Sequence, residues 1–398
     1  MTLGTAVGPG VAALRTPASI RERCANVLEA VESGAPASFV VRRDRLAACA
    51  DLVAATTRRR YPTLAIPYHS RWRHFEAGGV DRARRLDRLL ASRDPIGAAG
   101  ARIDLAIVSV LLDAGAGPAW SYFDASTGER YSRSEGLGVA SFEAFAAGIF
   151  SARLDDPLRV DASVLAGIDA AALARVFQAG ETNPLVGLEG RAALLRRLGE
   201  AVGDRPSSIF ASLLARGGDV AAADILGVLL ERTSAIWPSG VAIGGVPMGD
   251  VWPHPLAGGR GPSAGFVPFH KLSQWLAYSL FEPFERAGRD VVARDELTAL
   301  PEYRNGGLLL DSGVLALRDP ERALRRHSVG GELVVEWRAL TVALVDLLAP
   351  LVRERLGRPD LPLACVLEGG TWAAGRELAQ ARRGGEPPLA VASDGTVF

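Results

Sequence analysis

The stretch PASIRERCANVLEAV, residues 17–31, shows the pattern that decides the fold of this chain. Its apolar residues recur every three or four positions, at Ile20, Cys24, Val27, Leu28 and Val31. This spacing places them along one face of an amphipathic helix. Because similar spacing continues to residue 58, the sequence predicts that the chain opens with helices.

Helical periodicity returns through most of the remaining sequence. The segments that show it are 80–91, 101–114, 142–150, 171–177, 190–202, 209–215, 221–230, 271–287 and 333–355. Strand patterns are rare: residues 120–124 and 129–131, joined by a turn-prone Ala-Ser-Thr-Gly, predict one hairpin. The sequence therefore predicts a mainly α protein with at most one small β-hairpin.

The chain shows no alternation of strands and helices, no internal repeat and no flexible linker. Its connections are short and marked by proline and glycine, which favours one continuous helical domain, 1–398. The one subdivision that the pattern allows is an N-terminal helical subdomain, 15–100, packed on a 101–398 catalytic core.

Composition argues against several classes of protein. With 398 residues, 48% of them hydrophobic, the chain can bury a large core without a disulfide or metal to hold it. Its 45 basic and 45 acidic residues give a formal net charge of zero. Such a chain carries no overall field that would attract a nucleic-acid backbone or an anionic membrane surface, so neither is expected as a partner.

Cysteine usage and the first residues indicate a reducing compartment. The three cysteines, Cys24, Cys49 and Cys365, are isolated and lack CxxC spacing, so neither a disulfide framework nor a zinc cluster is expected. Residues 1–10 show no basic region followed by an apolar stretch of the export type, and no uncharged run approaches the length of a spanning helix. We therefore expect a cytoplasmic protein.

The segment IPYHSRWRHFE, residues 66–76, is the first candidate for a binding site. Arginine forks at 71 and 73 suit a phosphate, and the aromatic rings offer stacking faces for a sugar-like ligand. The alternative is a helix start whose aromatics belong to the core and whose arginines are solvated. The spacing of His69 and its neighbour at 74 matches no HExxH-like pattern, so a metal site is not expected.

Asp113 ends an apolar helix just before a glycine turn and Trp120. A carboxylate at the C-terminus of a helix is disfavoured by the helix dipole and needs compensation. Side chains at such boundaries often face a pocket, although an exposed acid that merely ends a helix is the alternative.

Residues 236–268 are rich in glycine, proline and tryptophan and are too long for a simple connector. With Asp250 and Trp252 on it, this interval resembles a ligand-binding loop. The next helix begins with His270 and Lys271, the only lysine of the chain. Cations at a helix start oppose the dipole, which indicates a bound anion, a paired carboxylate, or a tolerated surface charge.

Glu302, Tyr303 and Arg304 are adjacent between two apolar runs. A carboxylate in partly apolar surroundings can act as a nucleophile, an oxocarbenium stabiliser or a general acid/base. An ordinary surface turn is the alternative. Near the C-terminus, the run EGGTW, residues 368–372, would present backbone N–H groups to an anion or form a tight packing turn.

Taken together, these segments resemble the uracil catabolism protein 4 family. The motifs that carry the resemblance are PYHSRWRHF at 67–75, RSEGL at 133–137, TNPLVG at 182–187, HKLSQW at 270–275 and PEYRNGG at 301–307. They cover most of the chain. The resemblance implies a role in a pathway that opens uracil through ribosylurea-type intermediates.

A second resemblance is to the queuosine 5′-phosphate N-glycosylase family, whose helical fold is related to helix-hairpin-helix DNA glycosylases. Leu-Leu-Asp-Ala at 111–114 ahead of Trp120 is similar to its Leu-Asp-Ala-Leu-Asn segment ahead of a tryptophan, and Lys271 falls on its helix lysine. The segment 297–307 resembles its Leu-Thr-x-x-Ala-Asp-Tyr-Arg segment, which places Glu302 on the aspartate. Glu368 is similar to its closing acid. Glutamate replaces aspartate at 302, and this longer acid puts its role as nucleophile in doubt.

These resemblances imply an N-glycoside hydrolase that converts a ribosylurea, with or without a 5′-phosphate, to urea and ribose or its phosphate, with no cofactor. The expected catalytic residues are Glu302, Asp250 and Asp113. The expected substrate-binding residues are His69, Arg71, Arg73, Trp120, Trp252, His270, Lys271, Trp275, Tyr303, Arg304 and Glu368. The sequence leaves the oligomeric state open.

Three other functions remain open. Phosphoribosyl transfer is suggested by the Gly-Gly-Thr turn at 369–371, although the acidic pair and the strand–helix alternation of phosphoribosyltransferases are missing. Ring opening of the amidohydrolase type lacks a histidine cage for a metal. A metabolite-binding protein of the same pathway would keep the pocket and tolerate loss of Glu302.

Overall fold

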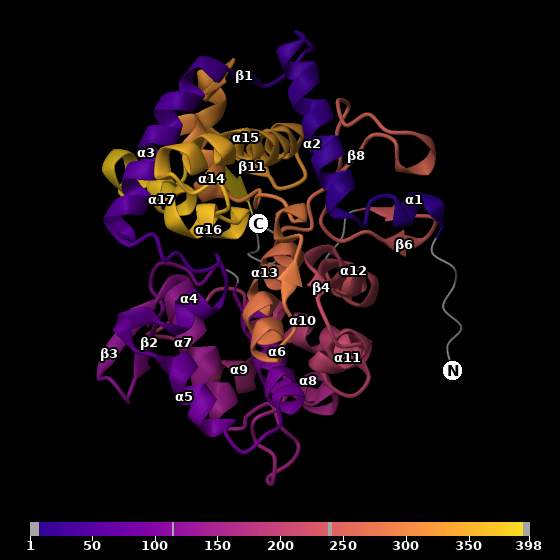
Figure 1. Ribbon diagram of the computed structural model, residues 1–398, viewed down its shortest axis with the longest axis vertical. Helices are drawn as coiled ribbons and strands as arrows, with labels where there is room; N and C mark the ends of the chain where they lie inside the picture. The colour runs from indigo at the N-terminus through magenta and orange to yellow at the C-terminus, as the bar shows by residue number, and fades with distance from the viewer. Residues whose placement is uncertain (1–7, 114, 238–240, 393–398) are drawn as a thin grey trace.

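The computed structural model describes residues 8–113, 115–237 and 241–392 of the chain (Figure 1). Ala114, at the end of a predicted helix, and residues 238–240, in the predicted site loop, lie outside the described residues. So do residues 1–7, which belong to the stretch considered for an export signal. The described chain is mainly helical, as the sequence predicts.

Helices follow one another along most of the described chain. They are α1 (Pro9–Ala12), α2 (Pro17–Glu32), α3 (Leu46–Arg60), α4 (Trp72–Phe75), α5 (Arg82–Leu89), α6 (Pro95–Leu111), α7 (Arg133–Ala146), α8 (Ala162–Gly167), α9 (Ala170–Val176), α10 (Leu188–Val202), α11 (Ala211–Ala215), α12 (Ala222–Thr233), α13 (Lys271–Arg286), α14 (Tyr303–Asp311), α15 (Glu332–Leu356), α16 (Leu363–Val366) and α17 (Trp372–Arg383). A π-helical turn, Leu367–Thr371, joins the last two.

The expectation of at most one β-hairpin is wrong, because the described chain contains several two-stranded sheets. The predicted hairpin is present as β2 (Ser121–Asp124) with β3 (Glu129–Ser132). The other pairs are β1 (Phe39–Val41) with β10 (Leu315–Leu317), β4 (Val220–Ala221) with β9 (Val291–Val292), β5 (Ala242–Ile243) with β6 (Val246–Pro247), β7 (Val251–Pro253) with β8 (Phe266–Pro268), and β11 (Arg326–Ser328) with β12 (Ala390–Ala392). Strands of two or three residues are too short to show an alternating pattern in the sequence.

Helices from the two ends of the sequence pack together in the upper part of Figure 1, where α15 contacts α2 and α3, and α14 lies against α17. The lower part holds the helices from α4 to α11, with α7 against α4 and α6. Helix α13 runs between these groups and packs on α6 and α12. One large hydrophobic cluster includes residues from both groups and from α13.

Local signals explain why the helices begin where they do. Thr16 caps α2 by accepting the backbone N–H of Ser19 at 3.1 Å, with Pro17 at the first helical position. Asp94 caps α6 in the same way, and residues 98–111 of that helix are all buried. A helix buried on all sides is a core helix, so α6 provides a fixed base for Asp113, which directly follows its end.

Close contact between α14 and α17 requires a glycine. A Cβ atom added to Gly375 on α17 would lie 2.1 Å from the carbonyl oxygen of Arg304 on α14. Only a residue without a side chain lets the two backbones approach so closely. This contact fixes the start of α14, and with it Glu302 and Tyr303.

The interval 236–268 folds into the β5–β6 and β7–β8 pairs rather than a single open loop. It lies against α1, α2 and the start of α15, and a small apolar cluster that includes Leu14 and Met248 anchors it. Within the described ranges, none of the helices combines the length and the apolar character needed to cross a bilayer.

Candidate active site

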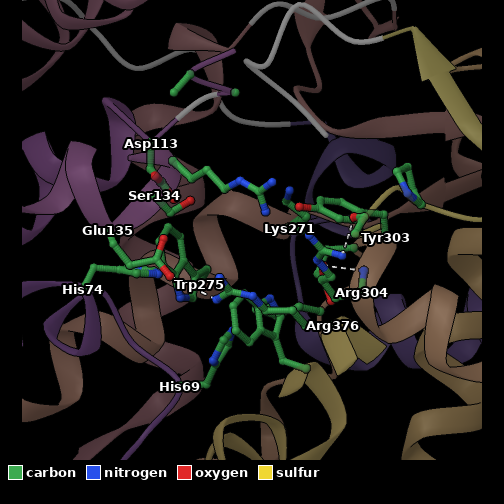
Figure 2. Close-up of a pocket in the computed structure, with 18 of the residues that line it drawn as sticks. His69, His74, Asp113, Ser134, Glu135, Lys271, Trp275, Tyr303, Arg304 and Arg376 are labelled. Atoms are coloured by element: carbon green, nitrogen blue, oxygen red, sulfur yellow. Dashed lines mark hydrogen bonds and ion pairs between the residues drawn. The ribbon is translucent and has the colours of Figure 1, made fainter. Parts of the chain in front are cut away.

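A cavity of about 700 Å³ opens where the two helix groups and α13 meet. Its walls come from the end of α3, the segment before and within α4, the loop after α6, and the first turns of α7, α13 and α14 (Figure 2). The π-helical turn, α17 and residues 385–391 complete it. The lining contains both cationic and carboxylate side chains together with Trp275 and Trp372, a mixture suited to a polar ligand with an anionic part.

Glu302 lies at this cavity as the N-cap of α14. Its two carboxylate oxygens accept the backbone N–H groups of Asn305 at 2.6 Å and Arg304 at 2.7 Å. Burial raises the pKa of Glu302 above its ordinary value, while these two N–H groups, followed by Lys271 and His69, act to lower it. The two N–H groups hold the carboxylate in place. Because each oxygen keeps a second lone pair, the carboxylate can still act on a ligand.

His69 and Glu368 form a hydrogen-bonded pair in the same wall. Nδ1 of His69 lies 2.8 Å from Oε2 of Glu368, while Arg60 and Tyr61 donate to Oε1 at 3.2 and 3.1 Å. Burial acts to raise the pKa of Glu368, but His69, Arg60 and Tyr61 outweigh it and lower that pKa.

The position of Glu368 is unusual because it belongs to the π-helical turn, a distortion often found at functional sites. Its bond to Nδ1 fixes the ring of His69, which lines the cavity, and no hydrogen bond to Nε2 is found within the described part of the chain. The arrangement is that of a histidine oriented by a carboxylate, which can transfer a proton through its other nitrogen.

A second charged cluster faces this pair across Trp275. Glu135, in the first turn of α7, accepts from Arg376 at 3.0 Å, and the ring of His74 meets Trp275 edge-on at 5.6 Å. Burial and the nearby Arg71 lower the pKa of His74 to about 4, so this imidazole is neutral at pH 7. Burial acts to raise the pKa of Glu135, yet a backbone N–H and Arg376 lower it.

Asp113 reaches the cavity from the end of α6 and pairs with Arg71 at 3.0 Å. Arg71 is fully buried, and its Nε donates to Ser109 at 2.6 Å. It therefore lies behind the wall and supplies the positive charge that a carboxylate at a helix C-terminus needs. Arg71 positions Asp113 and does not itself line the cavity.

Asp250 also lies behind the wall, in a buried ion pair. Both of its oxygens bind the guanidinium of Arg338, at 2.8 and 2.7 Å, and they also accept Trp252 Nε1 and the backbone N–H of Lys271. Burial acts to raise the pKa of Asp250, but Arg338 outweighs it and lowers that pKa to about 2. Asp250 thus caps the start of α13 and places Lys271 at the cavity.

Nine of the fourteen residues predicted from the sequence line the cavity. They are His69, Arg73, Asp113, Lys271, Trp275, Glu302, Tyr303, Arg304 and Glu368. Five others do not: Arg71, Trp120, Asp250, Trp252 and His270.

The predicted residues that do not line the cavity make contacts within the fold instead. Trp120 is buried and donates to the carbonyl of Phe177 at 2.9 Å, and Trp252 donates to Asp250. His270 is buried, adopts a left-handed φ of 47°, and its Nε2 lies 2.9 Å from the carbonyl of Leu14. None of the described residues of the predicted site loop, 236–268, lines the cavity.

Sequence reasoning missed several lining residues. They are Arg60, Ser70, His74, Arg133, Ser134, Glu135, Trp372 and Arg376. Signals for some of them existed, since His74 lies in the segment 66–76, and Arg133 and Glu135 lie in the motif at 133–137. No metal-binding group of three or more histidine, cysteine or carboxylate side chains occurs among the residues that the structure describes.

The described chain is therefore a mainly helical protein with a charged cavity that is also lined by tryptophan rings. Family comparison identifies the chain more closely: it belongs to the family described as "Protein of unknown function (DUF1688)", which matches residues 13–398. It is 39% identical over 408 residues to Protein urg3 of Schizosaccharomyces pombe and 35% identical over 435 residues to Uracil catabolism protein 4 of Lachancea kluyveri. Each alignment covers 98% of this chain and 99% of the relative. The resemblance to the uracil catabolism protein 4 family, inferred from the motifs, is confirmed.

Proposed function

We propose that the chain is an enzyme of uracil catabolism that hydrolyses the N-glycosidic bond of a ribosylurea. The pathway rests on the printed name of the relative from Lachancea kluyveri, which aligns with nearly the whole chain. The reaction rests on the cavity, together with the weaker sequence resemblance to N-glycosylases of helix-hairpin-helix type.

The observation that carries the proposal is that Glu302 and the His69–Glu368 pair line one cavity but differ in environment. Burial raises the pKa of Glu302, whereas partners lower the pKa of Glu368. Groups whose surroundings push their pKa values apart are typical of acid–base chemistry. His69 and Glu302 both line the cavity, and His69 acts to lower the pKa of Glu302.

In the proposed reaction, the bond between C1′ of the ribose and a urea nitrogen breaks, and water adds to C1′. The nitrogen takes a proton as urea leaves, and water supplies the new hydroxyl group and returns a proton to the protein. Ribosylurea and water thus give ribose and urea, with no oxidant, reductant or cofactor.

We assign the stabilisation of the positive charge that develops on the ribosyl ring to Glu302, because two backbone N–H groups hold its carboxylate in position. His69, oriented by Glu368, donates the proton to the departing nitrogen. Asp113, held by Arg71, is assigned to the activation of water. Trp275 provides the flat face on which the planar urea group rests.

The first test measures urea release from ribosylurea and from its 5′-phosphate. Glu302→Gln removes the charge and should lower kcat by at least about a hundredfold, whereas Glu302→Asp keeps a charged helix cap and should retain more activity than Glu302→Gln. The control is Glu296→Gln, which neutralises an exposed carboxylate outside the cavity and should leave kcat unchanged.

Three results of this test would overturn the assignment. Urea release that Glu302→Gln leaves intact would exclude a catalytic carboxylate at 302. Tight binding of both compounds without urea release would favour the metabolite-binding alternative. Release of urea only in the presence of pyrophosphate would favour phosphoribosyl transfer.

A further inference from the structure

The arginine side chains that line the cavity fall into two groups. Arg60, Arg73 and Arg376 each form an ion pair with a carboxylate, at 3.2, 2.7 and 3.0 Å. Arg133 and Arg304 also line the cavity, but no ion pair joins either to a carboxylate within the described part of the chain. Their positive charges are therefore available to a ligand.

Arg304 is the more informative of the two because it is only 6% exposed. One N–H of its guanidinium donates to the carbonyl of Gly385 at 3.1 Å, and its Nε is buried with no hydrogen-bond partner among the described residues. A guanidinium has five N–H donors. A buried positive charge with unused donors and no counter-charge is costly, and an anion supplied by a ligand would offset that cost.

Arg133, the first residue of α7, lines the same cavity. Its backbone φ of 54° is left-handed, a conformation that non-glycine residues rarely adopt and that is often found at functional sites. The two arginines act on a common group: burial raises the pKa of Tyr303, and both Arg304 and Arg133 act to lower it. Figure 2 shows Tyr303 and Arg304 side by side at one end of the cavity, with Lys271 nearby.

We infer that Arg133, Tyr303 and Arg304 form a subsite for a phosphate monoester. Two guanidinium groups and a phenol offer the charge-assisted and neutral donors that a phosphate prefers. This inference rests on the proposed function for the identity of the remaining ligand, and it selects ribosylurea 5′-phosphate over unphosphorylated ribosylurea as the substrate.

Besides Glu302, whose carboxylate acts to raise the pKa of Tyr303, a second carboxylate lines the cavity here: Glu386, which follows the Gly385 carbonyl that Arg304 binds. Its side chain is exposed and forms no ion pair with Arg133 or Arg304. Because its negative charge opposes a phosphate, its removal should strengthen the binding of a phosphate ligand. A purely structural role for the two arginines predicts no such gain.

The test is calorimetric titration with ribose 5-phosphate and with ribose. The intact protein should bind ribose 5-phosphate at least about tenfold more tightly than ribose. Arg133→Gln should weaken the binding of ribose 5-phosphate at least about tenfold, and Arg304→Lys should weaken it by a smaller factor. Glu386→Gln should strengthen it. The control Arg175→Gln changes an exposed arginine on α9 that does not line the cavity and should have no effect.

Binding and turnover separate this inference from the proposed function. Ribose 5-phosphate binding that depends on Arg133 supports the subsite even if no urea is released from any compound. Equal kcat/KM for ribosylurea and its 5′-phosphate, or an affinity for ribose 5-phosphate that Arg133→Gln and Arg304→Lys both leave within twofold, would overturn the subsite while the hydrolase stands.

Discussion

Replacement of Asp250 by alanine tests whether this residue is structural, as the fold indicates, or catalytic, as its place in the sequence suggested. The change removes two charge-assisted hydrogen bonds to Arg338, at 2.8 and 2.7 Å, and leaves that guanidinium charged and almost fully buried. It also removes the acceptor for Trp252 Nε1 and for the N–H of Lys271. Breaking a buried ion pair from one side costs about 3–5 kcal/mol, so Asp250→Ala should lower the free energy of unfolding by that amount.

The matched control is Asp360→Ala. Asp360 pairs with Arg358 through the same two-pronged geometry, at 3.1 and 3.2 Å, but lies on the surface. Exposed pairs contribute little because water screens them, so Asp360→Ala should not shift the urea denaturation midpoint. Equal midpoints for Asp250→Ala and Asp360→Ala would refute the argument that burial makes the first pair important.

Three further predictions follow from individual contacts. The pKa of Asp250 is about 2 in the folded protein, below its ordinary 3.8. The stability that the charged Asp250 contributes is therefore present above pH 4 and is lost as the pH falls toward 2. Over this range the free energy of unfolding of the wild type, measured by urea titration, should fall by about 2 kcal/mol more than that of Asp250→Asn. Gly375→Ala places a Cβ 2.1 Å from a carbonyl oxygen of α14 and should destabilise the fold by about 1–3 kcal/mol. The control is Gly227→Ala, at a helical glycine with open space around it, which should be neutral or stabilising by up to about 1 kcal/mol in the same assay. Equal denaturation midpoints for the two variants would contradict the close contact. Glu368→Gln keeps the size but not the charge that orients His69, so kcat for urea release should fall about tenfold or more with little change in KM, and an unchanged kcat would remove the pair from the mechanism.

The sequence predicted the helical class and the β2–β3 hairpin because both depend on local patterns. The helical spacing of apolar residues repeats over several turns and can be read from the sequence alone, as it can along α2 and α6. The remaining strand pairs were missed because their strands are short and their partners lie far away, as Phe39 lies opposite Leu317 in the β1–β10 pair. Such pairing is decided by tertiary packing.

The same difference between local and long-range patterns explains which site residues could be predicted. Glu302, Tyr303 and Arg304 could be predicted because a charged group between apolar runs is visible locally. The structural position of Asp250 could not, because its partner Arg338 is 88 residues away in the chain. Likewise, Glu135 and Arg376 form an ion pair although 241 residues separate them in the chain. Neither local sequence contains a pattern that predicts this pair.

The central claim is that the bond between C1′ and nitrogen is cleaved, and carbon-13 NMR tests it directly. The substrate is ribosylurea 5′-phosphate labelled with carbon-13 at C1′, incubated with the intact protein. The account predicts that the C1′ signal moves from that of an N-glycoside to those of the ribose 5-phosphate anomers, with one molecule of urea formed for each sugar. Loss of the urea carbonyl while C1′ stays bound to nitrogen would contradict the account and show that the protein cleaves the ureido group instead.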